Sequence, residues 1–256
     1  MKRFIPSLCL LFASAAYGFD PVILVLGRPG SGKGTFSEVA KKQGFKHISA
    51  GDLVRDEITR KTPIGIKIEE IVKRGEYLDK DLMFQLLEGR VKEAFKYNQK
   101  LIIDGYVRHP HELELIKKLL NELNKQEQTL ILLTDASKQK CFERMCFRLI
   151  CSTCKGIFSE KDLANGSNCP KCQSGQLEKR LGDIESVIKR RIDTFDEQLK
   201  AIYADLENSY PLIKIDANKS LKELDPIYEN FLSQILEFQG TALECFKSQK
   251  SNDLSL

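Results

Sequence analysis

The sequence predicts an α/β protein of three layers, with a parallel central sheet covered by helices on both faces. Short runs of β-branched residues and leucine alternate along the chain with longer stretches of helical periodicity. The first run, residues 22–26, is followed directly by a glycine-rich loop and then by a helical stretch. Uninterrupted apolar strands are typical of sheets buried on both faces, and alternation with helices favours parallel pairing.

The predicted strands are four short apolar runs, at residues 22–26, 101–103, 130–133 and 213–215. Polar residues close the last three runs, at Asp104, at Thr134 with Asp135, and at Asp216. Helical periodicity covers residues 35–42, 52–60, 79–96, 111–123, 138–149, 183–207 and 221–238. Residues 240–256 are polar and unpatterned, which predicts a frayed tail.

Composition narrows the class of protein. The chain has 256 residues, 42% of them hydrophobic, which is enough for a sizeable core. Its 40 basic and 36 acidic residues leave a net charge of +4 in mixed-sign runs, so composition demands no nucleic-acid partner. The longest uncharged apolar stretch, residues 4–19, is shorter than the roughly 18 apolar residues that a membrane helix needs, and it also contains Pro6, two serines and Gly18. We therefore expect no membrane span.

A glycine-rich loop with the sequence G-R-P-G-S-G-K-G-T spans residues 27–35. Glycines there let backbone N–H groups approach phosphate oxygens, the following helix adds positive potential at its N-terminus, and Lys33 can reach the terminal phosphates. The strict pattern G-x-x-x-x-G-K-[ST] fails by one position, since Gly34 follows the lysine and the hydroxyl arrives at Thr35. The loop predicts binding of nucleotide phosphate.

This departure resembles the loop of the adenylate kinase family, whose form is G-x-P-G-x-G-K-G-T. Further along, residues 48–55 (I-S-A-G-D-L-V-R) are similar to the family's entry into the monophosphate-binding segment, and residues 104–108 (D-G-Y-V-R) to its D-G-F-P-R, with Val107 in place of proline. Four arginines fall at the family's spacing for phosphate clamps: Arg144, Arg148, Arg180 and Arg191. The resemblance covers residues 22–236 and implies a monomeric enzyme that catalyses ATP + AMP = 2 ADP.

The resemblance also implies roles for individual residues, because catalysis of phosphoryl transfer is mainly positioning and charge neutralisation, with no general base. The implied catalytic residues are Lys33, Arg108, Arg148, Arg180 and Arg191. ATP would be bound by Gly30, Ser31, Gly32, Lys33, Gly34, Thr35, Arg144 and Arg148. The monophosphate would be bound by Ala50, Arg55, Leu78, Gly105, Arg108, Glu112, Arg180 and Arg191, with guanidinium groups gripping phosphate in pairs of bonds. Asp104 would hold Mg²⁺, through water.

Two C-x2-C pairs, Cys151 with Cys154 and Cys169 with Cys172, are separated by 14 residues. Their spacing predicts a structural zinc bound by four thiolates, with no open position for catalysis. Two disulfides are the alternative, favoured if the protein is exported. Many bacterial-type adenylate kinases carry such a site in the lid over ATP, so the resemblance supports zinc. Cys141 and Cys146 lie in helical sequence and are expected to be packing residues.

The domain organisation follows from these motifs. We expect a phosphate-loop core formed by residues 19–48, 79–146 and 184–239, and a flexible tail at 240–256. Residues 49–78 would form the monophosphate-binding insertion and residues 147–183 the zinc-bearing lid. Both would close on the core to exclude water, which predicts slow ATP hydrolysis without an acceptor.

Three departures from the family pattern bear on the substrate. Ala50 stands where adenylate kinases usually carry threonine, and alanine is common in relatives that phosphorylate UMP and CMP. Glu112 replaces a glutamine that contacts adenine, and a carboxylate cannot donate to a ring nitrogen. Gly182 replaces the first aspartate of R-x-D-D, which leaves Asp183 alone. AMP is favoured; a UMP/CMP-type kinase is the alternative.

Two other classes of protein are alternatives to an active kinase. A relative impaired in transfer would bind nucleotide without turning it over, and Gly182 and Val107 suggest it. A nucleic-acid-binding zinc ribbon would need a basic surface. Between Cys151 and Cys172, however, three lysines oppose two acidic residues and Phe158 is the only aromatic residue, which argues against nucleic acid.

The first 18 residues read as an export signal. Lys2 and Arg3 precede an apolar block, and Ala16 and Gly18 place small residues where a signal peptidase cleaves. An unusual first strand or a misassigned start codon is the alternative. Export would make the mature protein extracytoplasmic, whereas the supply of ATP and the family resemblance favour the cytoplasm.

Overall fold

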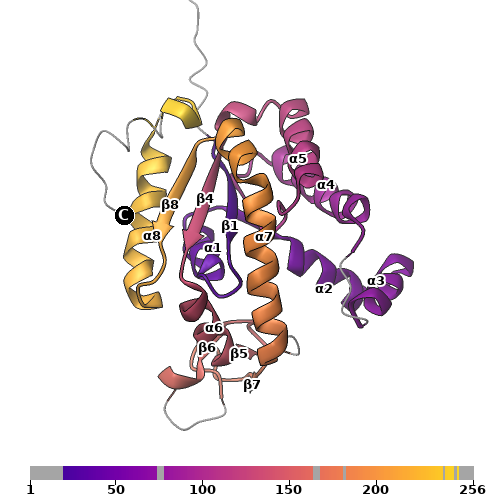
Figure 1. Cartoon of the computed structure of the whole chain (residues 1–256), viewed down its shortest axis with the longest axis vertical. Helices are drawn as coiled ribbons and strands as arrows, with labels where there is room; N and C mark the ends of the chain where they lie inside the picture. The colour runs from indigo at the N-terminus through magenta and orange to yellow at the C-terminus, as the bar shows by residue number, and fades with distance from the viewer. Residues whose placement is uncertain are drawn as a thin grey trace, which may run out of the picture.

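The computed structural model describes residues 20–73, 78–163, 168–180, 183–238, 240–244 and 247. At its centre lies a parallel sheet of five strands in the order β2-β3-β1-β4-β8 (Figure 1). The strands are β1 (Val22–Gly27), β2 (Lys46–Ser49), β3 (Leu101–Asp104), β4 (Thr129–Asp135) and β8 (Leu212–Asp216). Because all five are parallel, their carboxyl ends share one edge, where ligands bind in open α/β sheets.

Helices pack on both faces of this sheet (Figure 1). They are α1 (Lys33–Lys42), α4 (Lys80–Lys96), α5 (Pro110–Glu122), α6 (Lys138–Cys146), α7 (Glu185–Ser209) and α8 (Leu221–Glu237), with a 3-10 turn η1 (Gln126–Gln128) before β4. A second 3-10 turn, η2 (Glu160–Asp162), belongs to the smaller antiparallel unit described below. Along β1, Ile23 and Val25 belong to one core cluster with α1 and α8, while Leu24 and Leu26 belong to the other with α4 and α5. This division explains the unbroken apolar sequence of the strand.

Two smaller units leave the core near the carboxyl edge of the sheet (Figure 1). The first is a helix pair, α2 (Ala50–Arg60) and α3 (Pro63–Lys73). Ser49 begins it as an N-cap, since its hydroxyl accepts a hydrogen bond from the backbone N–H of Asp52. The second is an antiparallel sheet in the order β6-β5-β7, with β5 (Arg148–Cys151), β6 (Ile157–Ser159) and β7 (Leu177–Glu178).

The structure confirms the predicted fold class and all four predicted strands. The prediction of one helix over residues 138–149 was wrong at its end: α6 stops at Cys146, and Leu149 and Ile150 pair with β6. Strand β2 and helix α3 were not predicted. The first has only four residues, three of them polar, and depends on pairing with β3.

The two ends of the chain were predicted to be an export signal and a frayed tail. The predicted export signal, residues 1–18, lies outside the described residues, as does most of the predicted tail. Ala242, within that tail, is nevertheless buried against the core cluster of α1 and α8. Among the described residues, no helix is both long and apolar enough to cross a membrane.

Candidate active site

The phosphate loop connects the carboxyl end of β1 to the first turn of α1. Gly30 and Gly32 have φ values of 85° and 100°, in the left-handed region that favours glycine. A Cβ atom at residue 30 would also lie only 2.5 Å from the carbonyl oxygen of Cys141. Ser31 is fully buried, and its hydroxyl lies 2.6 Å from that of Thr134 on β4. The loop is therefore fixed to the sheet, and its backbone N–H groups lie at the N-terminus of α1, where a phosphate can bind.

Arg28 anchors the outside of this loop, a role that the sequence did not reveal. Its Nε donates to Asp196 Oδ1 on α7 at 2.6 Å, and its Nη1 donates to the carbonyl of Ala136 at 2.7 Å. Lys138 also pairs with Asp196, at 3.1 Å. The loop is thus joined to α7, the helix that carries Arg191.

Lys33 lies folded back against the loop, where its Nζ donates to the carbonyls of Gly27 and Arg28 at 2.6 and 2.9 Å. Burial lowers the pKa of Lys33 to about 8; Asp104 opposes this shift, whereas Arg108 and Arg191 add to it. The loop lysine, the carboxylate of β3 and two arginines predicted to clamp phosphate are therefore close enough to act on one another electrostatically.

Asp104 ends β3 beside His47 of β2, whose Nε2 lies 3.6 Å from Asp104 Oδ2. Burial alone would raise the pKa of Asp104, but His47, Lys33 and Arg108 outweigh it and keep the pKa below its ordinary value. The other carboxylate oxygen, Oδ1, is buried and has no hydrogen-bond partner within the described part of the chain. An ionised carboxylate with an unpaired oxygen beside a phosphate loop fits a hydrated divalent cation.

Three arginines from different segments lie close together. Burial lowers the pKa of Arg180 to about 10, and repulsion from Arg55 of α2 and Arg148 of β5 adds to this effect. Arg148 is itself held by Asp183, through Nε at 2.7 Å and Nη2 at 2.6 Å. Asp52 pairs with Arg55. The helix pair and the small sheet thus both direct positive charge toward one region.

Two further predicted arginines are fixed by backbone carbonyls. Arg144 donates to the carbonyl of Gly30 at 3.3 Å and to that of Lys219 at 2.5 Å, which places it against the phosphate loop. Arg108 donates through Nε to the carbonyl of Gly105 at 3.0 Å. Both side chains are partly buried, so solvent screens their charges less than it would at an exposed position.

The remaining residues predicted to bind nucleotide lie at the starts of α1, α2, α4 and α5. Glu112, in the first turn of α5, accepts a hydrogen bond from the backbone N–H of Arg108 at 2.8 Å, and burial raises the pKa of its carboxyl group. Ala50 is buried at the start of α2, and Leu78 is partly buried before α4. Gly34 and Thr35 lie in the first turn of α1. Gly182 lies outside the described residues.

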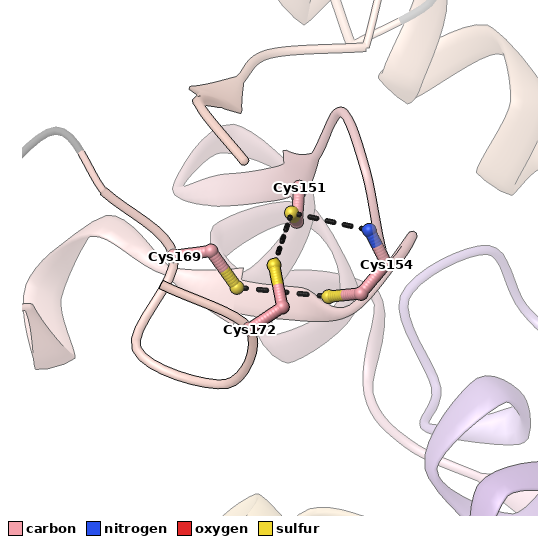
Figure 2. A group of neighbouring side chains, drawn as sticks. All are labelled: Cys151, Cys154, Cys169 and Cys172. Atoms are coloured by element: carbon pink, nitrogen blue, oxygen red, sulfur yellow. Dashed lines mark hydrogen bonds between the residues drawn. The ribbon is translucent and has the colours of Figure 1, made fainter. Parts of the chain in front are cut away.

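The four predicted zinc ligands meet in the small sheet (Figure 2). Their Sγ atoms lie within 4.8 Å of one another, and the pairs Cys151–Cys172 and Cys154–Cys169 are 3.6 Å apart. A disulfide would need about 2.05 Å, whereas tetrahedral zinc with bonds of about 2.3 Å separates its sulfurs by about 3.8 Å. Hydrogen bonds from Ser174 lower the pKa of Cys172, which favours the thiolate. The geometry fits a four-thiolate metal site.

Cys141, which lies outside this cluster, is fully buried, as expected for a packing residue.

The small sheet also reaches the phosphate loop. A Cβ atom at residue 34 would lie 3.4 Å from Ile157 Cδ1 of β6. Lys171, between two of the cysteines, pairs with Glu38 of α1 at 3.7 Å. The cysteine-bearing sheet therefore lies against the loop and the first helix of the core.

Comparison with known proteins agrees with this geometry. The family model described as adenylate kinase matches residues 25–209. An adenylate kinase of Mycoplasma mobile is 33% identical over 207 residues, which cover 79% of this chain and 93% of the relative. One of Elusimicrobium minutum is 30% identical, with 83% and 99% covered, and one of Chlamydia trachomatis is 29% identical, with 85% and 92% covered. The ordered motifs, the convergence of basic residues on Lys33 and these matches show that the chain belongs to the adenylate kinase family.

Proposed function

We propose that this enzyme transfers the terminal phosphoryl group of ATP to AMP, reversibly, and so forms two molecules of ADP. The observation that carries the proposal is two groups of positive charge: Arg108 and Arg191 beside Lys33, and Arg55 and Arg148 beside Arg180. Two polyanions repel each other, so a site that brings them together must neutralise their charge. Family membership supports the same reaction.

On the ATP side, the proposal assigns the phosphates to the loop N–H groups of residues 30–35 and to Lys33. The amides at the start of α1 carry positive potential and need no reorganisation when charge develops on the transferred group. Arg144 and Arg148 complete this side from α6 and β5. Lys33 would exchange its two carbonyl acceptors for phosphate oxygens.

On the monophosphate side, the proposal assigns the phosphate to Arg55, Arg108, Arg180 and Arg191. A planar guanidinium group can donate two parallel hydrogen bonds to phosphate oxygens, which fixes the orientation of the acceptor for in-line attack. Ala50, Leu78, Gly105 and Glu112 would surround the nucleoside. Lys33 and the arginines together would stabilise charge that spreads over the transferred oxygens.

Two metal ions complete the proposal. When bound with ATP, Mg²⁺ would neutralise phosphate charge, and Asp104 would hold it through water by its unpartnered oxygen. Zinc would be bound by Cys151, Cys154, Cys169 and Cys172 and would play a structural part only, because four thiolates leave no open position.

The expected setting of the reaction is a closed site within a monomer. Residues 49–78 and 147–183 would close over the two nucleotides and exclude water, so that AMP rather than water receives the phosphoryl group. The supply of ATP favours the cytoplasm, and an intact Met1 in the mature protein, seen by mass spectrometry, would support that compartment over export.

Purified protein assayed with ATP against AMP, CMP, UMP and GMP tests the proposed reaction. We expect the highest kcat/KM with AMP and slow ATP hydrolysis when no monophosphate is present. Faster turnover of CMP or UMP would replace AMP as the substrate, and binding of ATP without transfer to any acceptor would show an impaired relative.

Glu112→Gln is expected to improve the preference for AMP over CMP. The carbonyl oxygen of glutamine can still accept the hydrogen bond from the N–H of Arg108, while its amide adds the donor that a carboxylate lacks. One added hydrogen bond to the base should raise the ratio of the two kcat/KM values by roughly 3- to 10-fold. Exposed Glu114 lies on the same helix, so Glu114→Gln is the matched control. An unchanged ratio in Glu112→Gln would remove this residue from base selection.

A further inference from the structure

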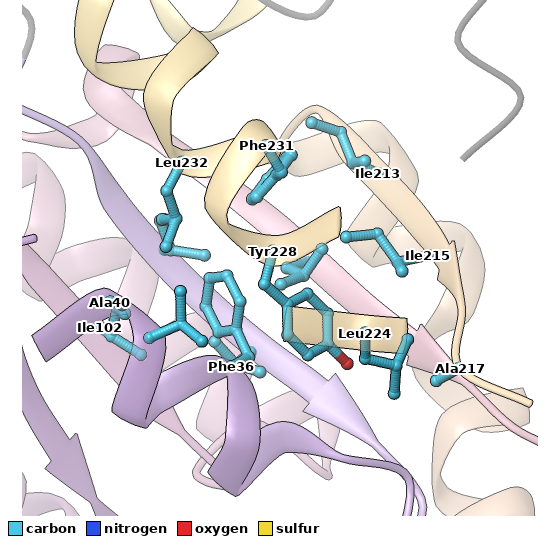
Figure 3. Close-up of a cluster of buried hydrophobic side chains, with 14 of the residues drawn as sticks. Phe36, Ala40, Ile102, Ile213, Ile215, Ala217, Leu224, Tyr228, Phe231 and Leu232 are labelled. Atoms are coloured by element: carbon cyan, nitrogen blue, oxygen red, sulfur yellow. The ribbon is translucent and has the colours of Figure 1, made fainter. Parts of the chain in front are cut away.

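Tyr228 of α8 is a fully buried residue whose hydroxyl has no hydrogen-bond partner among the described residues. Its ring packs edge to face against Phe36 of α1, with 5.3 Å between ring centroids. Figure 3 shows the ring inside the apolar cluster and the hydroxyl directed away from Phe231 and Leu232. Burying a hydroxyl without a partner costs about 1–3 kcal/mol, and phenylalanine would fill the same space without that cost.

The hydroxyl of Tyr228 lies against the phosphate loop. It is 3.2 Å from the position that a Cβ atom at residue 32 would occupy. Gly32 is the N-cap of α1 in the left-handed conformation and provides no side-chain cap. Arg144 is also near, since its charge opposes the upward shift that burial causes in the pKa of Tyr228.

The outer side of the loop presents hydrogen-bond acceptors. In a planar trans peptide the N–H and C=O groups point in opposite directions, so a loop that turns its N–H groups toward phosphate turns the matching carbonyls outward. The carbonyl of Gly30 is one such acceptor, and it accepts from Arg144, whose charge also acts on Tyr228. A phenol at this place can donate to such a carbonyl in the conformation of the loop that binds phosphate.

We propose that Tyr228 is a positioning residue of the phosphate loop, whose hydroxyl donates to a loop carbonyl in the conformation that binds nucleotide phosphate. The proposal rests on the proposed function only in that the loop binds ATP. A hydrogen bond formed only in one conformation favours that conformation and the ligand that selects it. Burial of the unpaired hydroxyl destabilises the free protein, and the hydrogen bond formed in the bound conformation then strengthens the binding of ATP.

The test compares Tyr228→Phe with Tyr210→Phe, which removes the same atom from a second buried tyrosine. Tyr210 precedes β8 and so lies at the amino end of the strands, whereas the phosphate loop lies at their carboxyl end. Its hydroxyl also has no hydrogen-bond partner among the described residues. In both variants the melting temperature of the free protein should stay equal or rise. Only Tyr228→Phe should weaken ATP binding, by roughly 3- to 10-fold in calorimetry, with an unchanged KM for AMP.

A direct readout uses wild-type protein labelled with ¹³C at tyrosine Cζ. The Tyr228 resonance should move when ATP is added, and the Tyr210 resonance should stay in place. Wild-type ATP affinity in Tyr228→Phe, an equal loss in Tyr210→Phe, or a fall in melting temperature with equal loss of ATP and AMP affinity would each overturn the proposal. Wild-type protein that binds ATP but phosphorylates no monophosphate would contradict the proposed function and leave this comparison valid.

Discussion

Lys33→Met should abolish phosphoryl transfer, with a loss of roughly 10³-fold or more in kcat/KM, because a preorganised positive charge at the transferred group is removed. Methionine replaces the apolar stem of the lysine side chain and removes only the ammonium group, so folding should be retained. Transfer from ATP to AMP measures the effect. Lys42→Met, an exposed lysine of the same helix, is the control and should keep full activity.

The same variant gives a second readout through pH. In the free protein the pKa of Lys33 is lowered to about 8, so the neutral amine becomes appreciable above pH 8. Bound polyphosphate stabilises the charged form and raises this pKa again. Binding of ATP should therefore take up a proton and weaken as the pH rises through 8 to 10, and calorimetry of Lys33→Met should lack this uptake. Turnover by Lys33→Met within tenfold of the wild type would exclude the loop as the site of transfer.

The local features of the site were predictable from sequence because each is encoded by neighbouring residues. Gly30 and Gly32 mark the loop through their backbone conformations, and Asp104 marks the end of an apolar strand. The two cysteine pairs have the spacing of a metal site, and the structure brings all four sulfur atoms together as that spacing predicted. Parallel strands explain why such residues gather at one edge of the sheet.

Other features depend on contacts between distant segments, and single-sequence patterns do not report these. Arg28 meets Asp196 across 168 positions of the chain, and His47 reaches Asp104 only because short strand β2 pairs with β3. Tyr228 fits the apolar stripe of α8 like any core residue, so its hydroxyl at the loop was invisible in the sequence. The helix predicted through residue 149 failed for the same reason, since pairing with β6 decides the conformation there.

Removal of zinc should unfold the cysteine-bearing sheet and abolish kinase activity. The three strands of this sheet are two to four residues long, and Cys151 is the one buried residue among them. Structural zinc contributes about 10–16 kcal/mol to the folding of small metal-binding units, far more than such a core provides. Cys172→Ser, or a strong chelator, should lower the melting temperature and expose residues 147–183 to proteolysis.

Loss of this sheet would act on catalysis through the arginines that it holds. Arg148 lies on β5 and Arg180 follows β7, so unfolding would withdraw both charges and the bidentate pair with Asp183. Activity should fall by at least roughly 10²-fold, while Cys146→Ser, a cysteine outside the cluster, should keep both activity and metal. Zinc measured at one equivalent in the wild type and much less in Cys172→Ser would agree with this account. Inactivation by a reductant but not by a chelator would instead indicate two disulfides.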